Sequence, residues 1–265
     1  MKTFLMCEPR YFEVCYVINP WMTANIGRVD QAFAARQWKT LFDTLAQKSN
    51  IKLIEPVAGL PDMVFTANAG LVSRQHEVVV AAFRHPERQG ESAHYKKFFT
   101  DAGYHLKSIP QNIFFEGAGD ALFDSSRELW IGSGPRSDIA AVDTIKNTLQ
   151  LSTNPLELID PRWYHLDTAF CPLSDGYALA YEKAFSAESV ELIRHKLGSK
   201  VIWVSDEDAI NFACNAVCLD HEIILYRASS ALKALLTSYN FSVIEIDVSE
   251  FMKSGGSCKC MTLEI

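Results

Sequence analysis

Two cysteines near the end of the chain are the first candidates for chemistry. Residues 255–262 place Cys258 and Cys260 one residue apart behind a pair of glycines. A deprotonated cysteine is a strong nucleophile. A buried thiol and a Cys-x-Cys metal pair are alternatives. The metal alternative is weaker, because a closed zinc site needs four ligands at recognisable spacing and only Cys214 and Cys218 offer a second pair.

Proton-transfer groups occur in two earlier segments. His165 and Asp167 stand at positions i and i+2, and in a strand this spacing predicts that both side chains face the same side. Glu116 and Asp120 flank small residues that permit a close approach of the backbone. A structural histidine and a solvated acidic turn are the alternatives. A cysteine, a proton-carrying histidine and an orienting carboxylate together favour covalent thiol catalysis, and the additional carboxylates favour a cationic substrate.

The composition is that of a soluble globular protein. Of 265 residues, 48% are hydrophobic and 22% charged, which excludes disordered, collagen-like and disulfide-stapled miniprotein classes. The net charge is −7, and lysine and arginine form no cluster. We therefore expect no nucleic-acid partner and no binding to an anionic membrane surface.

The cysteine count and the hydropathy pattern predict a cytoplasmic protein. Seven cysteines are an odd number in a chain of this length, which fits reduced thiols better than a disulfide framework. The first apolar run is too short for a secretory signal, and no stretch of about 18 apolar residues occurs.

Helical periodicity recurs along the whole chain. Five amphipathic stretches are predicted: residues 30–48, residues 91–102 before Gly103, a helix after Ser137 or Asp138, a helix from about Ser186 to Gly198, and residues 229–239. In the first stretch one face carries Ala34, Trp38, Leu41, Phe42 and Leu45. Short apolar runs such as 63–65 with 78–81, and 121–123 with 129–131, predict strand pairs between the helices.

The repeating unit is strand, strand, helix, strand. Each unit has one polar residue beside its first strand pair, and these residues are 45 to 52 positions apart: Asn68, Asp120, Asp167, Asn215 and Cys260. Five such units would stack around a common axis as a closed array, and their equivalent loops would meet near that axis. No linker interrupts the chain, so residues 1–265 are predicted to form one domain.

The motifs together resemble those of a known superfamily. They are LPDMVFTAN at 60–68, EGAGD at 116–120, IGSGPR at 131–136, HLDT at 165–168 and the segment 255–262. They are similar to those of the guanidino-group-modifying superfamily, which contains arginine deiminases, dimethylarginine dimethylaminohydrolases, amidinotransferases and arginine dihydrolases. The resemblance implies an α/β fold, the five-bladed propeller called the pentein fold, with five ββαβ units around a pseudo-fivefold axis.

The resemblance also implies roles for individual residues. Cys260 corresponds to the nucleophile, His165 to the general acid/base and Glu116 to the carboxylate that holds the imidazole. The implied substrate-binding residues are Asp167 on guanidinium nitrogens, Arg136 and Arg84 on the α-carboxylate, and Asn68, Asn19, Phe65 and Asp120 nearby. Cys258 falls outside the family's cysteine position. No metal and no organic cofactor are expected.

The implied reaction proceeds through a covalent intermediate. An imidazolium and a bound guanidinium lower the pKa of a neighbouring thiol, which supplies a thiolate near neutral pH. The thiolate attacks the guanidinium carbon, His165 protonates the leaving nitrogen, and an S-alkylthiouronium remains. The same histidine then activates water.

Asn68 distinguishes this chain from several members of the superfamily. Deiminases and dimethylarginine hydrolases typically carry an aspartate at this position, which favours a cationic guanidinium over a neutral ureido group. An asparagine both donates and accepts hydrogen bonds, so it can also hold a ureido oxygen and permit a second hydrolysis. Residues 7–12, 19–22 and 65–68 look most like cyanobacterial-type arginine dihydrolases, which convert arginine to ornithine, ammonia and carbon dioxide.

The leading hypothesis is therefore a cysteine-dependent arginine dihydrolase that acts on arginine or a derivative. The alternatives are a dimethylarginine dimethylaminohydrolase, then an arginine deiminase or an amidinotransferase. A ribosome-binding pentein is the non-enzymatic alternative, but it would not need Cys260, His165, Glu116 and Asp167 together. The sequence leaves the formation of a homo-oligomer open.

Overall fold

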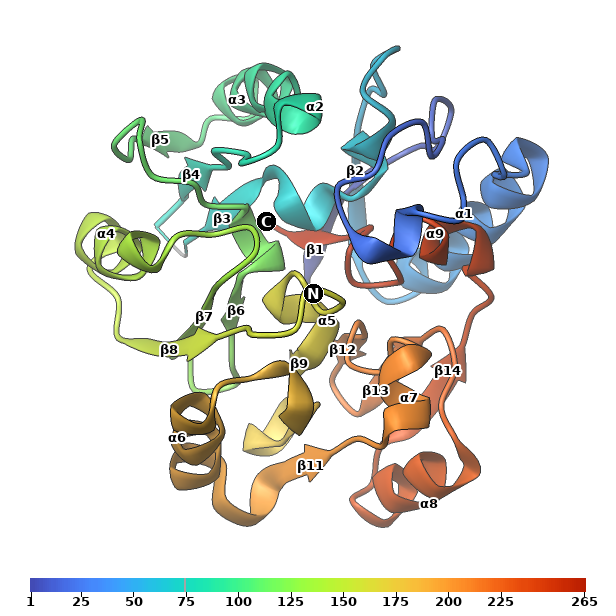
Figure 1. Cartoon of the computed structure of the whole chain (residues 1–265), viewed down its shortest axis with the longest axis vertical. Helices are drawn as coiled ribbons and strands as arrows, with labels where there is room; N and C mark the ends of the chain where they lie inside the picture. The colour runs from blue at the N-terminus through green and yellow to red at the C-terminus, as the bar shows by residue number, and fades with distance from the viewer. Residues whose placement is uncertain (74) are drawn as a thin grey trace.

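The structure is a computed structural model that describes residues 1–73 and 75–265. It contains five three-stranded sheets arranged around a common centre, with the longest helix of each unit on the outside (Figure 1). In each sheet the middle strand pairs antiparallel with one neighbour and parallel with the other. The five-bladed α/β architecture predicted from the repeats is confirmed.

Four of the units are continuous in the sequence. One unit comprises β3 (Gly70–Val72), β4 (Glu77–Val80), α2 (Pro86–Gln89), α3 (Glu91–Asp101) and β5 (His105–Lys107), and the next comprises β6 (Ala121–Phe123), β7 (Leu129–Ser133), α4 (Ile139–Leu149) and β8 (Thr153–Glu157). The two that follow comprise β9 (Phe170–Pro172), β10 (Ala178–Ala180), α6 (Ala187–Leu197) and β11 (Val201–Trp203), and then β12 (Val217–Leu219), β13 (Glu222–Leu225), α8 (Ser230–Ser238) and β14 (Ser242–Glu245).

The fifth unit combines both ends of the described chain. It contains β1 (Thr3–Cys7), α1 (Gln31–Ala46), β2 (Asn50–Ile54) and the late strand β15 (Leu263–Glu264). Strand β15 pairs antiparallel with β1, with Leu5 opposite Leu263, while β1 pairs parallel with β2. Both termini therefore lie near the centre of the ring (Figure 1). This pairing closes the array, and it places Cys260 three residues before β15.

The five predicted helices are confirmed to within two residues at their ends. Asp30, Ser186 and Ser229 each accept a hydrogen bond from a backbone N–H in the first turn of α1, α6 and α8. Asp138 precedes α4, but its carboxylate accepts from the Phe114 N–H instead of capping the helix.

Hydrophobic side chains pack between each sheet and its outer helix. In the fifth unit, Trp38 and Leu41 of α1 pack in one cluster with Phe4 and Met6 of β1. Shorter helices lie between the units: α5 (Leu166–Ala169), α7 (Asp206–Ile210) and α9 (Ser249–Met252). None of the helices formed by residues 1–73 and 75–265 is long and apolar enough to cross a bilayer.

Two strand predictions were wrong. Residues 63–65 do not begin a strand pair, because Pro61 opens a 3-10 helix (Pro61–Val64) and the strand that pairs with β4 is β3. His165 and Asp167 do not share a strand either. His165 has an extended backbone, whereas Asp167 lies in the first turn of α5, which begins at Leu166 because the Leu166 N–H donates to the Asp120 carboxylate.

Candidate active site

The structure brings the five repeated polar residues together at the centre of the ring. Each one lies just before the strand that pairs antiparallel with the middle strand of its sheet. All five are buried: Asn68, Asp120, Asp167, Asn215 and Cys260. Contacts join neighbouring units directly, since Asn215 Nδ2 donates to the carbonyl oxygen of Asp167 at 3.0 Å and lies 3.1 Å from Cys260 Sγ.

The Cys260 thiol lies against the Asp167 carboxylate. Its Sγ is 3.8 Å from Oδ1 and 3.7 Å from Oδ2, and both side chains are almost fully buried. Burial raises the pKa of the Cys260 thiol, and the negative charge of Asp167 adds to that increase. Burial also raises the pKa of Asp167 to about 7, although the Lys259 ammonium opposes the effect. A cation between these two groups would favour the ionised form of both.

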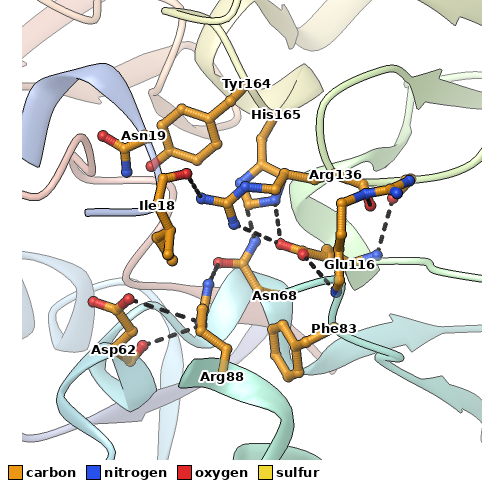
Figure 2. Close-up of polar contacts among 12 residues, drawn as sticks. Ile18, Asn19, Asp62, Asn68, Phe83, Arg88, Glu116, Arg136, Tyr164 and His165 are labelled. Atoms are coloured by element: carbon orange, nitrogen blue, oxygen red, sulfur yellow. Dashed lines mark hydrogen bonds and ion pairs between the residues drawn. The ribbon is translucent and has the colours of Figure 1, made fainter. Parts of the chain in front are cut away.

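His165 is held by Glu116. Nε2 of His165 lies 2.8 Å from Glu116 Oε2, and the same oxygen accepts a hydrogen bond from Arg136 Nη1 at 2.9 Å (Figure 2). Burial alone would raise the pKa of Glu116, but the charges of Arg136 and His165 outweigh it and hold the pKa well below its usual range. Glu116 is therefore a buried anion, and it can stabilise a protonated imidazole.

Arg136 connects several segments around this carboxylate. Besides Glu116, it donates Nη2 to the carbonyl oxygen of Ile18 at 3.1 Å, and its guanidinium lies 4.5 Å above the ring of Tyr164 (Figure 2). Tyr164 in turn donates its hydroxyl to the carbonyl oxygen of Gly255 at 2.8 Å. The Arg136 guanidinium thus holds the loop at Ile18 against Tyr164, which precedes His165, and Tyr164 in turn contacts the loop that leads to Cys260.

Arg84 contacts the cluster with its backbone. Its N–H donates to Glu116 Oε1 at 3.2 Å, and its Nε donates to the carbonyl oxygen of Arg136 at 3.1 Å. The rest of its guanidinium forms an ion pair with Asp138 and lies over the ring of Phe114. The structure therefore places the Arg84 guanidinium beside Asp138, with 32% of the side chain exposed.

Asn19, Phe65 and Asp120 shape the surrounding backbone. Asn19 Nδ2 donates to the carbonyl oxygen of Ser254, and Phe65 packs against Gly256, where any Cβ would clash with the ring. Asp120 accepts from Ser137 Oγ at 2.6 Å and from the Leu166 N–H at 2.9 Å, and its Oδ2 is 4.0 Å from His165 Nε2. Burial raises the pKa of Asp120 to about 6.

Asn68 lies between Arg88 and His165 (Figure 2). Its Oδ1 accepts from Arg88 Nη1 at 2.8 Å, and its Nδ2 lies 3.5 Å from His165 Nδ1. Arg88 is itself fixed by a bidentate ion pair with Glu91, at 2.8 Å for each contact. Because Arg88 takes the oxygen, the NH₂ group of Asn68 faces the histidine.

Arg88 is a residue of the site that the motifs and the spacing did not predict. Arg88 follows Asn68 by 20 residues, and Arg136 follows Glu116 by the same interval. Each arginine donates Nη1 to its partner, at 2.8 and 2.9 Å. The two pairs do not occupy equivalent positions, however, because the residue that corresponds to Asn68 in the next unit is Asp120, so the repeat does not identify Arg88.

The second cysteine of the pair lies outside this network. Cys258 is fully buried in the cluster that contains Trp38 and Phe251, and burial raises the pKa of its thiol to about 12. Within the described part of the chain, no group of three or more His, Cys, Asp or Glu side chains is arranged to hold a metal ion.

Comparison with known proteins identifies the family. The family model for "N,N dimethylarginine dimethylhydrolase, eukaryotic" matches residues 22–265. The chain belongs to this family. A dimethylarginine dimethylaminohydrolase from Mycobacterium tuberculosis is 40% identical over 266 residues, which cover 100% of this chain and 86% of that protein.

The chain is also similar to bifunctional enzymes. The arginine dihydrolase/ornithine cyclodeaminase ArgZ of Synechocystis sp. is 47% identical over 263 residues, 98% of this chain. The chain spans only 37% of the length of that relative. A crystal structure of the N-terminal domain of ArgZ, an asparagine-to-serine variant covalently bound to a reaction intermediate, matches with a TM-score of 0.98 at 45% identity, covering 100% of this chain and 97% of that one.

Proposed function

We propose that this chain is a cysteine-dependent arginine dihydrolase that converts arginine to ornithine, two molecules of ammonia and carbon dioxide. The observation that carries the proposal is the contact between the buried Cys260 thiol and the Asp167 carboxylate, together with a histidine held by an anionic Glu116. The similarity to ArgZ along nearly the whole chain supports the same reaction.

Binding of the guanidinium activates the nucleophile in this proposal. Asp167 receives guanidinium nitrogens, and the added positive charge lowers the raised pKa of both Asp167 and Cys260. The thiolate therefore forms together with the substrate complex.

The α-carboxylate of the substrate is assigned to Arg136 and Arg84. Arg136 uses only some of its five N–H donors on Glu116 and on the carbonyl oxygen of Ile18. Arg84 is the more exposed of the two arginines. An arginine fork suits a carboxylate, so this pair would hold the amino-acid end of the substrate.

The chemistry takes place in two rounds. The Cys260 thiolate attacks the guanidinium carbon, His165 gives a proton to the leaving nitrogen, and ammonia departs to leave an S-alkylthiouronium. Water deprotonated by His165 attacks the same carbon, which expels the thiolate and gives citrulline. A second hydrolysis consumes another water, breaks the remaining carbon–nitrogen bonds of the ureido carbon and releases ornithine, ammonia and carbon dioxide.

Asn68 is the residue that favours the second round. Its NH₂ group faces His165 because Arg88 holds its oxygen, so it presents an uncharged donor to the site. Such a donor can bind the oxygen of a neutral ureido group, whereas a carboxylate would prefer the cation.

Dimethylarginine hydrolysis is the second candidate function. It is supported by the family match and by the Mycobacterium tuberculosis relative. Asp167 beside Cys260 favours an unmethylated guanidinium, because its oxygens need N–H donors. Dimethylarginine supplied as the sole substrate separates the two candidates through the release of dimethylamine.

A matched pair of cysteine variants tests the nucleophile. Cys260→Ser is expected to lose at least 1,000-fold in turnover of arginine, whereas Cys258→Ser is expected to keep most of it. Acid-quenched protein incubated with arginine should carry a mass adduct on the peptide that contains residue 260. Full turnover by Cys260→Ser would refute the proposal.

A further inference from the structure

Asn215 forms two side-chain contacts with the proposed nucleophile. Its Oδ1 accepts the backbone N–H of Cys260 at 3.0 Å, and its Nδ2 lies 3.1 Å from Cys260 Sγ. Nδ2 also donates to the carbonyl oxygen of Asp167 at 3.0 Å. Asn215 is completely buried, so these contacts are made without competition from bulk solvent.

The chemistry of its partners fixes which way the Asn215 amide faces. A backbone N–H can only donate, so the oxygen of the amide must face Cys260 N. The NH₂ group is then directed at the two remaining partners, the Asp167 carbonyl and the sulfur. A carbonyl oxygen can only accept, and a thiolate is a far better acceptor than a thiol.

The backbone around Asn215 is also held in place. Its N–H donates to the carbonyl oxygen of Phe212 at 2.9 Å, and Phe212 adopts a left-handed φ of 54°. Its own carbonyl oxygen accepts the N–H of Lys259 at 3.3 Å. Asn215 therefore binds the N–H groups of two consecutive residues at the nucleophile, which ties the loop before β12 to the loop before β15.

We propose that Asn215 is a further residue of the site, which orients Cys260 and donates a hydrogen bond to its thiolate. This role deepens the proposed function, and it rests on that function for its effect on turnover. Asn215 occupies the same place in its unit as Asp167 and Cys260 do in theirs, so the repeat supplies the nucleophile, the cation-binding carboxylate and the thiolate donor from equivalent positions.

The charged groups around Cys260 explain why a neutral donor is needed. The negative charge of Asp167 disfavours the thiolate, whereas the positive charge of Lys259 favours it. The buried Tyr164 hydroxyl and His165 lie in the segment that immediately precedes Asp167. A positive group in contact with the sulfur would compete with the guanidinium for Asp167. An amide N–H stabilises the thiolate without that competition, and the low local dielectric strengthens the bond.

The reactivity of Cys260 without substrate tests this proposal. The rate of its alkylation by iodoacetamide is measured against pH, with peptide mass spectrometry to separate Cys260 from the exposed Cys15. Asn215→Asp keeps an oxygen for Cys260 N–H but turns a carboxylate oxygen toward the sulfur. We expect alkylation of Cys260 at pH 8 to slow at least tenfold and its pH profile to move to higher pH.

A charge-matched control variant is Asn211→Asp, which adds the same charge at the end of α7 and is expected to alkylate like the unmodified protein. Asn215→Ser serves as a second variant, expected to slow alkylation by a smaller factor. Unchanged Cys260 alkylation in a folded Asn215 variant would overturn the proposal. Because no substrate is used, this result is independent of whether the chain hydrolyses arginine.

A measurement on the unmodified protein covers the case in which both variants fail to fold. One side-chain amide proton of Asn215 should shift in the NMR spectrum over the same pH range as the ¹³Cβ resonance of Cys260. An Asn215 amide that does not respond to that ionisation would overturn the proposal.

Discussion

His165 and Glu116 are joined by a single contact of 2.8 Å between Nε2 and Oε2. The same oxygen accepts from Arg136, so one buried carboxylate faces an imidazole and a guanidinium at once. The imidazole therefore has its Nε2 occupied, and its Nδ1 is the nitrogen that faces Asn68. Proton transfer to or from substrate is expected at Nδ1.

Glu116→Gln tests this arrangement. The variant removes the charge that stabilises a protonated His165 and leaves Arg136 buried without a counter-ion. We expect at least a 100-fold loss of kcat and a loss of about 3 kcal/mol in the free energy of unfolding, measured by steady-state kinetics and urea denaturation. The surface variant Glu182→Gln, which disrupts an exposed ion pair with Arg194, should change stability by less than about 1 kcal/mol. Equal losses of kcat and of stability in the two variants would contradict the role assigned to Glu116.

Asn68→Asp tests the basis of the second hydrolysis. An aspartate would keep the contact with Arg88 but would present a negative oxygen in place of the NH₂ group. We expect citrulline to accumulate from arginine and turnover of added citrulline to fall at least tenfold, as measured by amino-acid analysis. An unchanged ratio of ornithine to citrulline would show that Asn68 does not govern the second round.

The sequence predicted the centre of the site better than its periphery. Equivalent positions in a repeat must converge when the array closes, so the grouping of Asn68, Asp167, Asn215 and Cys260 could be inferred from spacing. Spacing could not show that Arg84 pairs with Asp138, because that contact joins loops of different units. Nor could it show the helix at α5, because the contact that starts it comes from Asp120, 46 residues earlier.

Gly119→Ala tests how closely the backbone must approach the site. The backbone of Gly119 has no left-handed conformation, but a Cβ there would clash with Asn68 Nδ2 and lie 3.3 Å from His165 Cγ. We expect the methyl group to displace both side chains, lowering kcat/KM at least tenfold and stability by about 1–3 kcal/mol. Gly90→Ala is the matched control, since its Cβ would meet only methyl groups of Leu60. A fully active Gly119→Ala would mean that Asn68 can move without cost to the reaction.

Asp167 predicts a pH dependence of stability. Its pKa is raised by burial to about 7 from an unfolded value of 3.8, so the folded protein keeps a proton that the unfolded chain has lost. Asp167 therefore makes stability fall as the pH rises between about 4 and 7. Relative to Asp167→Asn, the free energy of unfolding should drop by about 3 kcal/mol between pH 5 and pH 8. The free energy of unfolding of both proteins is measured by urea titration at each pH. The same change with pH in both proteins would contradict the raised pKa of Asp167.

The products formed from arginine distinguish a dihydrolase from a deiminase. The purified protein is incubated with arginine until the substrate is exhausted, and ornithine, citrulline and ammonia are quantified together. We expect one ornithine and two ammonia for each arginine, with citrulline only as a transient. Citrulline as the sole amino-acid product would make the chain a deiminase, and no consumption of arginine would contradict the proposed function altogether.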